Sequence, residues 1–171
     1  MYAATPYRGW VLKISPDGNM TPFAPGFRSP NGLGVDLQNR LFVTDNQGDW
    51  LGTSKLFHVQ QGRFYGHPAS LTWSGDWKKG RNPLKVAAGE FDAKRTRAAV
   101  LFPQGFMANS PTQPLPDSTK GRFGPFAGQL LVGEMNRSRI VRVMLDEVAG
   151  ELQGACVPFY DDAGLTRGSH R

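Results

Sequence analysis

The sequence predicts an all-β protein, because its apolar residues recur in short stretches separated by turn-forming residues. Glycine and proline number 21 and 13 among the 171 residues, without a collagen-like period. Apolar residues make up 39% of the chain, which is enough for a core of ordinary size. Long segments of helical periodicity are absent from the sequence. These features together indicate many short strands joined by tight turns.

The first predicted hairpin lies near the N-terminus. Residues 10–14 (WVLKI) have the pattern of a strand, and residues 20–23 return as its partner. Asp17-Gly18 between them is a strong tight-turn pair.

A second predicted pair joins residues 31–35 to residues 40–44. The run Pro30-Asn31-Gly32 predicts a turn that leads into this pair. In the connection between the two strands, Asn39 tolerates the left-handed backbone that such a turn requires.

The remaining predicted strands lie in two groups. Residues 54–59 and 63–65 form a third pair that turns at Gly62. Much later the same order returns, with strands expected at residues 129–132, 139–143 and 151–159.

These motifs form a repeat. WVLKI, KLFHV and RIVRV begin at positions 10, 55 and 139, so their spacings are 45 and 84 residues, the second nearly twice the first. LFVTDN at 41–46 and LLVGEMN at 130–136 both end in an acidic residue followed shortly by Asn. A four-stranded propeller blade uses roughly 40 to 50 residues. The chain is therefore predicted to be an incomplete β-propeller of about two to three four-stranded blades with a long loop-rich insertion.

The predicted blade pieces cover about residues 1–24, 28–68 and 106–160, with the insertion at about 69–105. Turn-forming residues break the strand rhythm from 69 to 127, where one strand is expected, near 98–102. Propellers need four or more blades to close a ring. We therefore expect a piece of a longer protein, which the uncapped ending GLTRGSHR also favours, and self-association of the sheets is the alternative.

Composition argues against several classes of protein. The formal charge of +6 comes from scattered basic residues, with small clusters only at 78–81 and 94–97, so nucleic-acid binding is not predicted. Cys156 is the single cysteine, which excludes a disulfide or a cysteine-based metal site within the chain. Neither an apolar stretch of membrane-spanning length nor a signal peptide is recognised in the sequence.

Four segments in a fixed order carry a family resemblance: RSPNGLGVD, RLFVTDNQGDW, SKLFHV and QGRFYGHP. They resemble the soluble quinoprotein glucose/sorbosone dehydrogenase family. Gly121 to Leu130 and Gln153 to Phe159 are further similar to a subgroup of large secreted bacterial propeller proteins, often joined to a c-type haem module. The resemblance covers about residues 28–71 and 105–171, and the Cys-x-x-Cys-His motif of such a module is absent from this sequence.

The resemblance implies a six-bladed propeller that holds pyrroloquinoline quinone (PQQ) and calcium on its top face and oxidises a sugar or alcohol. It also implies a secreted or periplasmic location and a c-type cytochrome module in the parent protein. Carried over by position, Arg28 matches the arginine beside the quinone, Ser29 replaces an Asn and Asn31 replaces a Gln, whereas Phe27 stands at a His position. The expected cofactor-binding set also includes Gln47 and Gly48, from the run at the end of the second strand. No catalytic residue is assigned.

A metal site is the second expectation. Asp45, Asn46 and Asp49 offer oxygen ligands after a second strand, as do Glu134 and Asn136 in the later repeat. Hard cations such as calcium bind several converging oxygens. Turn formation and the ending of a strand ladder explain Asp and Asn equally well, because no 12-residue calcium loop is present.

Two other functions remain open. Gluconolactonase and NHL-repeat propellers share the Pro-Asn-Gly-Leu and Val-Thr-Asp runs, and gluconolactonases bind a divalent metal that polarises a lactone. A non-catalytic propeller that binds carbohydrate or protein is the other alternative, and the changes at Phe27 and Ser29 favour it. A sugar-binding groove would use aromatic side chains, for which the candidates are Trp50, Trp73, Trp77 and Tyr65. His58 and His67 are expected to be structural, and His170 has no evident partner.

Overall fold

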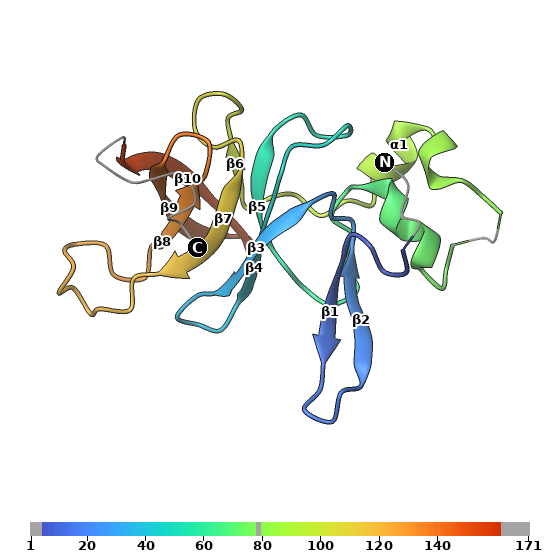
Figure 1. The fold of residues 1–171 in the computed structure, drawn as a ribbon, viewed down its shortest axis with the longest axis horizontal. Helices are drawn as coiled ribbons and strands as arrows, with labels where there is room; N and C mark the ends of the chain where they lie inside the picture. The colour runs from blue at the N-terminus through green and yellow to red at the C-terminus, as the bar shows by residue number, and fades with distance from the viewer. Residues whose placement is uncertain (1–4, 78–79, 162–171) are drawn as a thin grey trace. The chain divides into compact units, whose positions relative to one another are not determined.

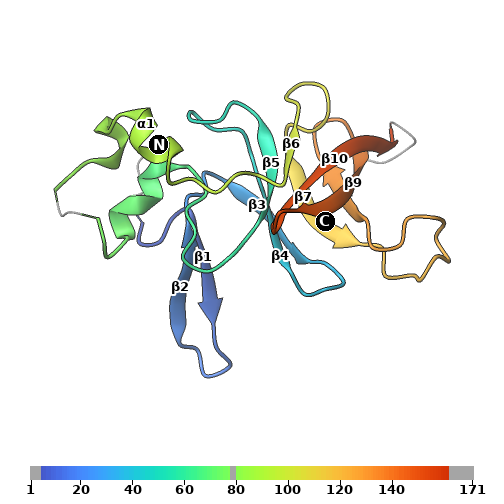
Figure 2. The same cartoon turned by 180° about the vertical axis from the view of Figure 1, so that it is seen from behind.

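The computed structural model describes residues 5–77 and 80–161. The chain divides into two compact units, one made of Met1–Ser29 with Gln60–Arg97 and the other of Pro30–Val59 with Ala98–Arg171. Figures 1 and 2 show the ribbon from opposite sides. His170 and the GLTRGSHR ending lie outside the described residues. In the part of the chain that is described, no helix has the length and apolar character needed to cross a membrane.

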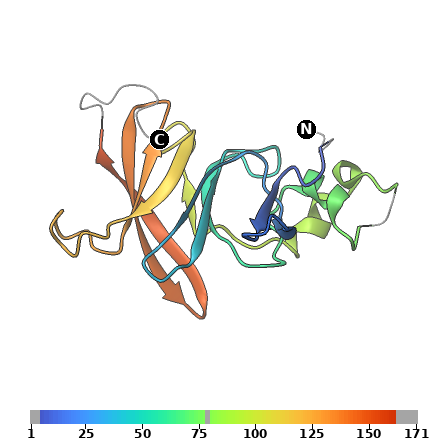
Figure 3. The ribbon, with the colours of Figure 1, turned by 60° about the horizontal axis from the view of Figure 1, so that its bottom comes forward.

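The second unit consists of two four-stranded antiparallel sheets, and in each sheet every strand pairs with the next one along the chain. The strands of the first sheet are β3 (Pro30–Val35), β4 (Leu41–Asp45), β5 (Ser54–His58) and β6 (Val100–Phe102). Those of the second sheet are β7 (Pro111–Pro116), β8 (Leu130–Glu134), β9 (Arg139–Val148) and β10 (Glu151–Tyr160). Figure 3 shows the long β9–β10 hairpin, in orange to red, from a third direction.

Most of the predicted strands are confirmed. β3 and β4 form the predicted second pair, and Asn39 in their turn has a φ of 59°, the left-handed backbone expected of it. β6 confirms the strand expected near 98–102. The second sheet contains the three later strands, with Ala149 and Gly150 at positive φ in the turn between β9 and β10.

The predicted pairing of residues 54–59 with 63–65 is wrong. β5 pairs with β6 instead, so that the fourth strand of this sheet follows the loop-rich segment rather than preceding it. Residues 63–65 belong to the first unit, where the Tyr65 amide donates to the Pro25 carbonyl at 2.9 Å. Gly62 bends the chain as expected, but its own amide donates to the Phe23 carbonyl at 2.8 Å. Hydrogen bonds to this distant segment outweigh the local hairpin.

The proline-rich run PTQPLP, in which no strand was expected, forms strand β7. Proline has no amide hydrogen to donate, so within sheets it is confined largely to edge strands. Among the described strands, β7 is an edge strand of its sheet and pairs only with β8, where Pro114 lies opposite Val132. The edge position therefore explains how a segment with three prolines can form a strand.

The run Pro30-Asn31-Gly32 is the beginning of β3 and not the turn that was expected. The two glycines of β3, Gly32 and Gly34, allow close packing instead. A Cβ atom on Gly32 would lie 2.4 Å from the Cα of Gln113, and one on Gly34 would lie 2.2 Å from the carbonyl oxygen of Pro114. Only glycine lets β3 lie so close to the backbone of β7.

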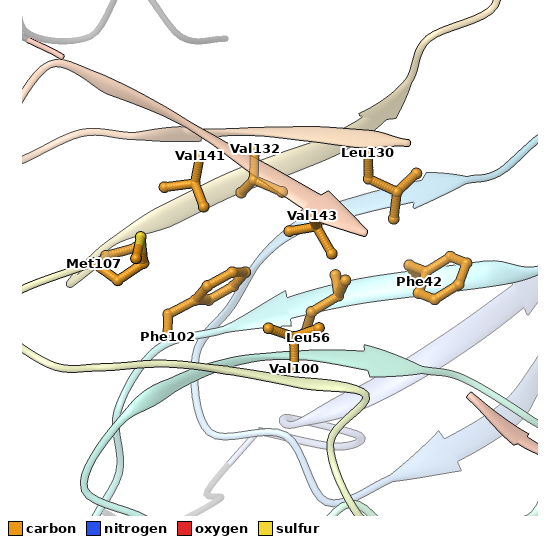
Figure 4. Packing of buried hydrophobic residues seen from close by; sticks show 10 residues of the cluster. Phe42, Leu56, Val100, Phe102, Met107, Leu130, Val132, Val141 and Val143 are labelled. Atoms are coloured by element: carbon orange, nitrogen blue, oxygen red, sulfur yellow. The ribbon is translucent and has the colours of Figure 1, made fainter. Parts of the chain in front are cut away.

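The core of the second unit lies between the two sheets, as Figure 4 shows. In the strands that line this layer, the residues pointing into it alternate with residues pointing away, because successive side chains of a strand point to opposite faces. The buried residues of the cluster are Phe42, Leu56, Val100, Phe102, Met107, Ala108, Leu130, Val132, Val141 and Val143. Leu145, Leu152 and the half-buried Cys156 pack against them. The two sheets are thus joined mainly by interdigitated apolar side chains.

The first unit combines one hairpin with short helices. β1 (Trp10–Ile14) pairs with β2 (Met20–Pro25), which confirms the first predicted hairpin, and Gly18 in its turn has a φ of 84°. The helices are η1 (Pro68–Trp73), η2 (Pro83–Lys85) and α1 (Ala88–Asp92). The Trp10 indole nitrogen donates to the carbonyl oxygen of Ser70 at 2.8 Å and so ties the hairpin to η1.

Replacing Leu56 by alanine is expected to lower the free energy of unfolding by about 2–5 kcal/mol, because it leaves a cavity in the layer between the sheets. Leu115→Ala is the matched control: Leu115 is 60% exposed, and its loss is expected to cost no more than about 0.5 kcal/mol. Urea unfolding of the two variants measures the difference. Equal losses would contradict the assignment of Leu56 to the core.

Candidate functional site

The sequence-predicted site residues of the second unit lie along one edge of its two sheets. The meander brings the starts of β3 and β7 beside the ends of β4 and β8, with Pro30 opposite Asp45 and Pro111 opposite Glu134. The loops after β4 (residues 46–53) and after β8 (residues 135–138) leave from this edge. We call this edge with its loops the rim.

Asn31 connects the two sheets at the rim. Its side-chain nitrogen donates a hydrogen bond to the Pro111 carbonyl at 3.1 Å and lies 3.9 Å from the sulfur of Met135. Deeper in the interface, the hydroxyl of Thr44 donates to the carbonyl of Thr112 at 2.9 Å. Asn31 is nevertheless exposed, so its side chain remains accessible from solvent.

Glu134 is a fully buried carboxylate that organises the rim loops of the second sheet. Its Oε1 accepts hydrogen bonds from the amides of Asn109, Ser110 and Asn136 at 3.2, 3.0 and 3.1 Å. Its Oε2 accepts one from the amide of Arg137 at 2.7 Å. Several such donors satisfy a buried carboxylate without a counter-ion. Glu134 therefore shapes the loops, and this role accounts for its acidic character.

Arg139 is a second buried charge at this rim, 7% exposed, that sequence reasoning did not single out. Its Nη1 donates to the carbonyl of Phe106 at 2.6 Å, while Nε and Nη2 bind the two carboxylate oxygens of Asp161 at 2.9 and 2.6 Å. These hydrogen bonds from Arg139 lower the pKa of Asp161 below its ordinary value. Arg139 thus ties the loop before β7 to the end of β10.

Asp45 lies beside a lysine. Asp45 is 1% exposed and Lys55 4% exposed, and the Lys55 ammonium lies 3.7 Å from Asp45 Oδ2 and 2.7 Å from the Asn46 carbonyl oxygen. Asp49 is exposed. Among the described residues, no three His, Cys, Asp or Glu side chains gather as metal ligands would. The sequence predictions did not single out Lys55; the antiparallel pairing of β4 with β5 places it directly opposite Asp45.

The expected cofactor-binding residues are divided between the two units. Asn31, Gln47 and Gly48 belong to the rim, where Gln47 and Gly48 are half-buried and the Gly48 amide donates to the Leu51 carbonyl at 2.9 Å. Arg28 and Ser29, also half-buried, belong to the first unit and directly precede β3.

Phe27, which stands where the family has histidine, is a packing residue. It is 1% exposed, and its ring stacks on that of Tyr65 with the centroids 5.0 Å apart. The Tyr65 hydroxyl accepts a hydrogen bond from the Gln60 amide, and burial raises the pKa of Tyr65. Tyr65 is buried, and the ring of Trp77 stacks on that of Phe91. Both of these residues, which were expected to line a groove, therefore pack within the first unit.

The two described histidines also have structural surroundings. His67 is 8% exposed and precedes η1. His58, at the end of β5, packs against Phe42, with the two ring centroids 5.5 Å apart. Burial, followed by the charge of Arg40, lowers the pKa of His58, and Asp36 and Glu147 oppose that shift.

Two meandering four-stranded sheets, packed face to face with their first strands adjacent, are consecutive blades of a β-propeller. The chain is similar to the solved structure of an oxidoreductase (glucose dehydrogenase) from Thermus thermophilus, with a TM-score of 0.53, 20% identity, and coverage of 85% of this chain and 35% of that one. It is also similar to the PQQ-bound form of an aldose sugar dehydrogenase from Streptomyces coelicolor, with a TM-score of 0.52, 18% identity, and coverage of 86% and 39%.

The chain thus spans little more than a third of the length of these two structures. Neither a family model nor a curated protein sequence matches it. The structural likeness confirms the predicted propeller fold and, at the level of the fold, the resemblance to quinoprotein sugar dehydrogenases.

Replacing Glu134 by glutamine is expected to destabilise the protein by about 2–3 kcal/mol, because the new amide group presents a donor to amides that are themselves donors. Glu151→Gln, at the exposed start of β10, is the control and is expected to change stability little. Urea unfolding measures both. Amide hydrogen exchange at Asn109, Ser110, Asn136 and Arg137 should accelerate in Glu134→Gln alone, and unchanged exchange would contradict the proposed role.

His58 predicts a pH dependence of stability. Because its pKa in the folded protein lies below the ordinary value of 6.5, the unfolded chain takes up a proton first as the pH falls. The stabilisation is present above that ordinary value and is lost as the pH falls through the folded pKa. His58→Gln should therefore lose less thermal stability than wild type between about pH 7.5 and about pH 5. Parallel melting curves for the two proteins would contradict this.

Proposed function

We propose that this chain forms part of the cofactor face of a PQQ-dependent sugar or alcohol dehydrogenase. The observation that carries the proposal is the combination of a propeller fold like that of a PQQ-bound aldose sugar dehydrogenase with Arg28 at the matching motif position. The names of the two solved structures described above are those of sugar dehydrogenases. A periplasmic or secreted location and a c-type cytochrome module in a longer protein belong to the same proposal.

The donor set suits an anionic quinone. Arg28 is expected to pair with a carboxylate of PQQ through two parallel hydrogen bonds, the geometry that a guanidinium provides. Ser29, Asn31 and Gln47 are expected to add neutral hydrogen-bonding groups, and the Asn31 amide already donates to the Pro111 carbonyl and lies 3.9 Å from the Met135 sulfur. When bound, PQQ supplies a two-electron acceptor for the hydrogen of an alcohol carbon. The contribution of this chain is to bind and orient that group.

A non-catalytic propeller that binds carbohydrate or protein is the second candidate. Phe27 favours it, because its buried ring stacked on Tyr65 provides no polar partner for a cofactor. His58 and His67 favour it too, since packing accounts for both and a dehydrogenase needs a base to take the hydroxyl proton.

Titration with PQQ of the longer protein that the proposal calls for, followed by quenching of tryptophan fluorescence, tests the proposal. Arg28→Ala should weaken binding about tenfold or more, since a charge-assisted hydrogen bond contributes about 1.5–3 kcal/mol. Arg97→Ala, at an exposed position of the same unit, is the control and should bind like wild type. Absence of saturable PQQ uptake by wild type would overturn the proposal and favour the second candidate, for which a panel of oligosaccharides is the next ligand.

A further inference from the structure

Lys55 is buried far more deeply than lysine usually is. It is 4% exposed and lies on β5 directly opposite Asp45 of β4, which is 1% exposed. Fully buried lysine and aspartate are rare unless the two are paired. The rim therefore contains an internal ion pair at the base of the loop of residues 46–53.

The Lys55 ammonium is surrounded by the kinds of oxygen that a hard cation selects. It donates to the carbonyl oxygen of Asn46 at 2.7 Å and to that of Thr53 at 3.4 Å, and it lies 3.7 Å from Asp45 Oδ2. Carboxylate and main-chain carbonyl oxygens are also the usual ligands of calcium. Asn46 and Thr53 are the first and last residues of the loop, so one ammonium ties its two ends together.

We propose that the ammonium of Lys55 occupies the place of a metal ion at this loop, so that the rim of the first sheet is held by an internal cation and needs no calcium. A metal bound by Asp45 and the Asn46 carbonyl would share its ligands with the ammonium. Two like charges in a buried site repel each other strongly, because water does not screen them there. The metal site predicted at Asp45, Asn46 and Asp49 is the competing hypothesis.

The second sheet provides an internal comparison. There Glu134 ends the second strand as Asp45 does in the first sheet, and it too faces a basic residue, Arg139, across the ladder. Arg139 binds Asp161 and the Phe106 carbonyl, and four amides satisfy Glu134. At the rim, four amide hydrogens thus surround the buried carboxylate of the second sheet, whereas an ammonium lies beside that of the first.

The proposal is independent of whether the protein binds PQQ. It makes Lys55 a positioning residue for the loop that carries Gln47 and Gly48, whatever ligand that loop meets. A failed PQQ titration would leave it unchanged, and calcium binding at Asp45 would overturn it without affecting the PQQ proposal.

Wild-type protein provides the first test. Its melting temperature is expected to be the same in millimolar calcium as in a chelator, and terbium luminescence should show no saturable site. Asp45→Asn serves to locate any binding that is found. A calcium-dependent rise in the melting temperature of wild type that Asp45→Asn abolishes would overturn the proposal.

Chemical rescue provides the second test. Lys55→Ala removes the ammonium and leaves room for a small one, so its melting temperature should fall by about 10 °C and recover partly in propylammonium chloride. The same concentration of tetramethylammonium chloride, which cannot donate hydrogen bonds, should not restore it. Lys55→Met should be equally destabilised but not rescued, because its side chain fills the space.

Lys13→Ala, at an exposed position of β1, controls for general loss of a lysine and should melt like wild type. Wild-type stability in Lys55→Met would overturn the proposal, as would equal recovery of the alanine and methionine variants in propylammonium. If Lys55→Ala does not fold, the calcium measurement on wild type decides between ammonium and metal.

Discussion

The packing of the β3–β6 sheet against the β7–β10 sheet is the constraint on which the second unit depends. Two glycines of β3 allow its backbone to lie against that of β7, and apolar residues at alternate positions of the other strands fill the space between the sheets. A side chain at Gly32 or Gly34 would collide with main-chain atoms, which cannot move aside as a flexible side chain can. The close approach of the first strands therefore sets how the remaining strands meet.

Each sheet also buries a negative charge at the rim. The second strand of each sheet ends in a buried acidic residue, Asp45 in one sheet and Glu134 in the other. A buried carboxylate is costly unless hydrogen bonds or an opposite charge compensate for it. Four amides compensate Glu134, whereas Lys55 lies beside Asp45. The buried carboxylate at the end of the second strand thus has a different neighbour in each sheet, and in both sheets these contacts also hold the loop that follows.

The candidate site was predictable only in part. Asn31 and the Asp45–Asp49 run do lie at the rim, because the order of the strands puts their ends at one edge of the sheet. The burial of Phe27 and its stacking on Tyr65 were not predictable from the sequence. Tyr65 lies beside Phe27 because amides of residues 62–67 donate hydrogen bonds to carbonyl oxygens of residues 23–26, and these residues do not form the local hairpin that was expected. The cofactor-binding set of Arg28, Ser29, Asn31, Gln47 and Gly48 remains a proposal.

By itself, the sequence determined the all-β class, most strand positions and the tight turns, because these follow from local periodicity and from residues such as Asn39 and Gly18 that tolerate unusual backbone angles. Only the tertiary structure decided that β6 completes the first sheet and that the proline-rich run is an edge strand. It also decided that Lys55 neutralises Asp45. These features depend on which distant segments compete for the same hydrogen-bonding edge or the same buried charge, and local sequence patterns do not describe that competition.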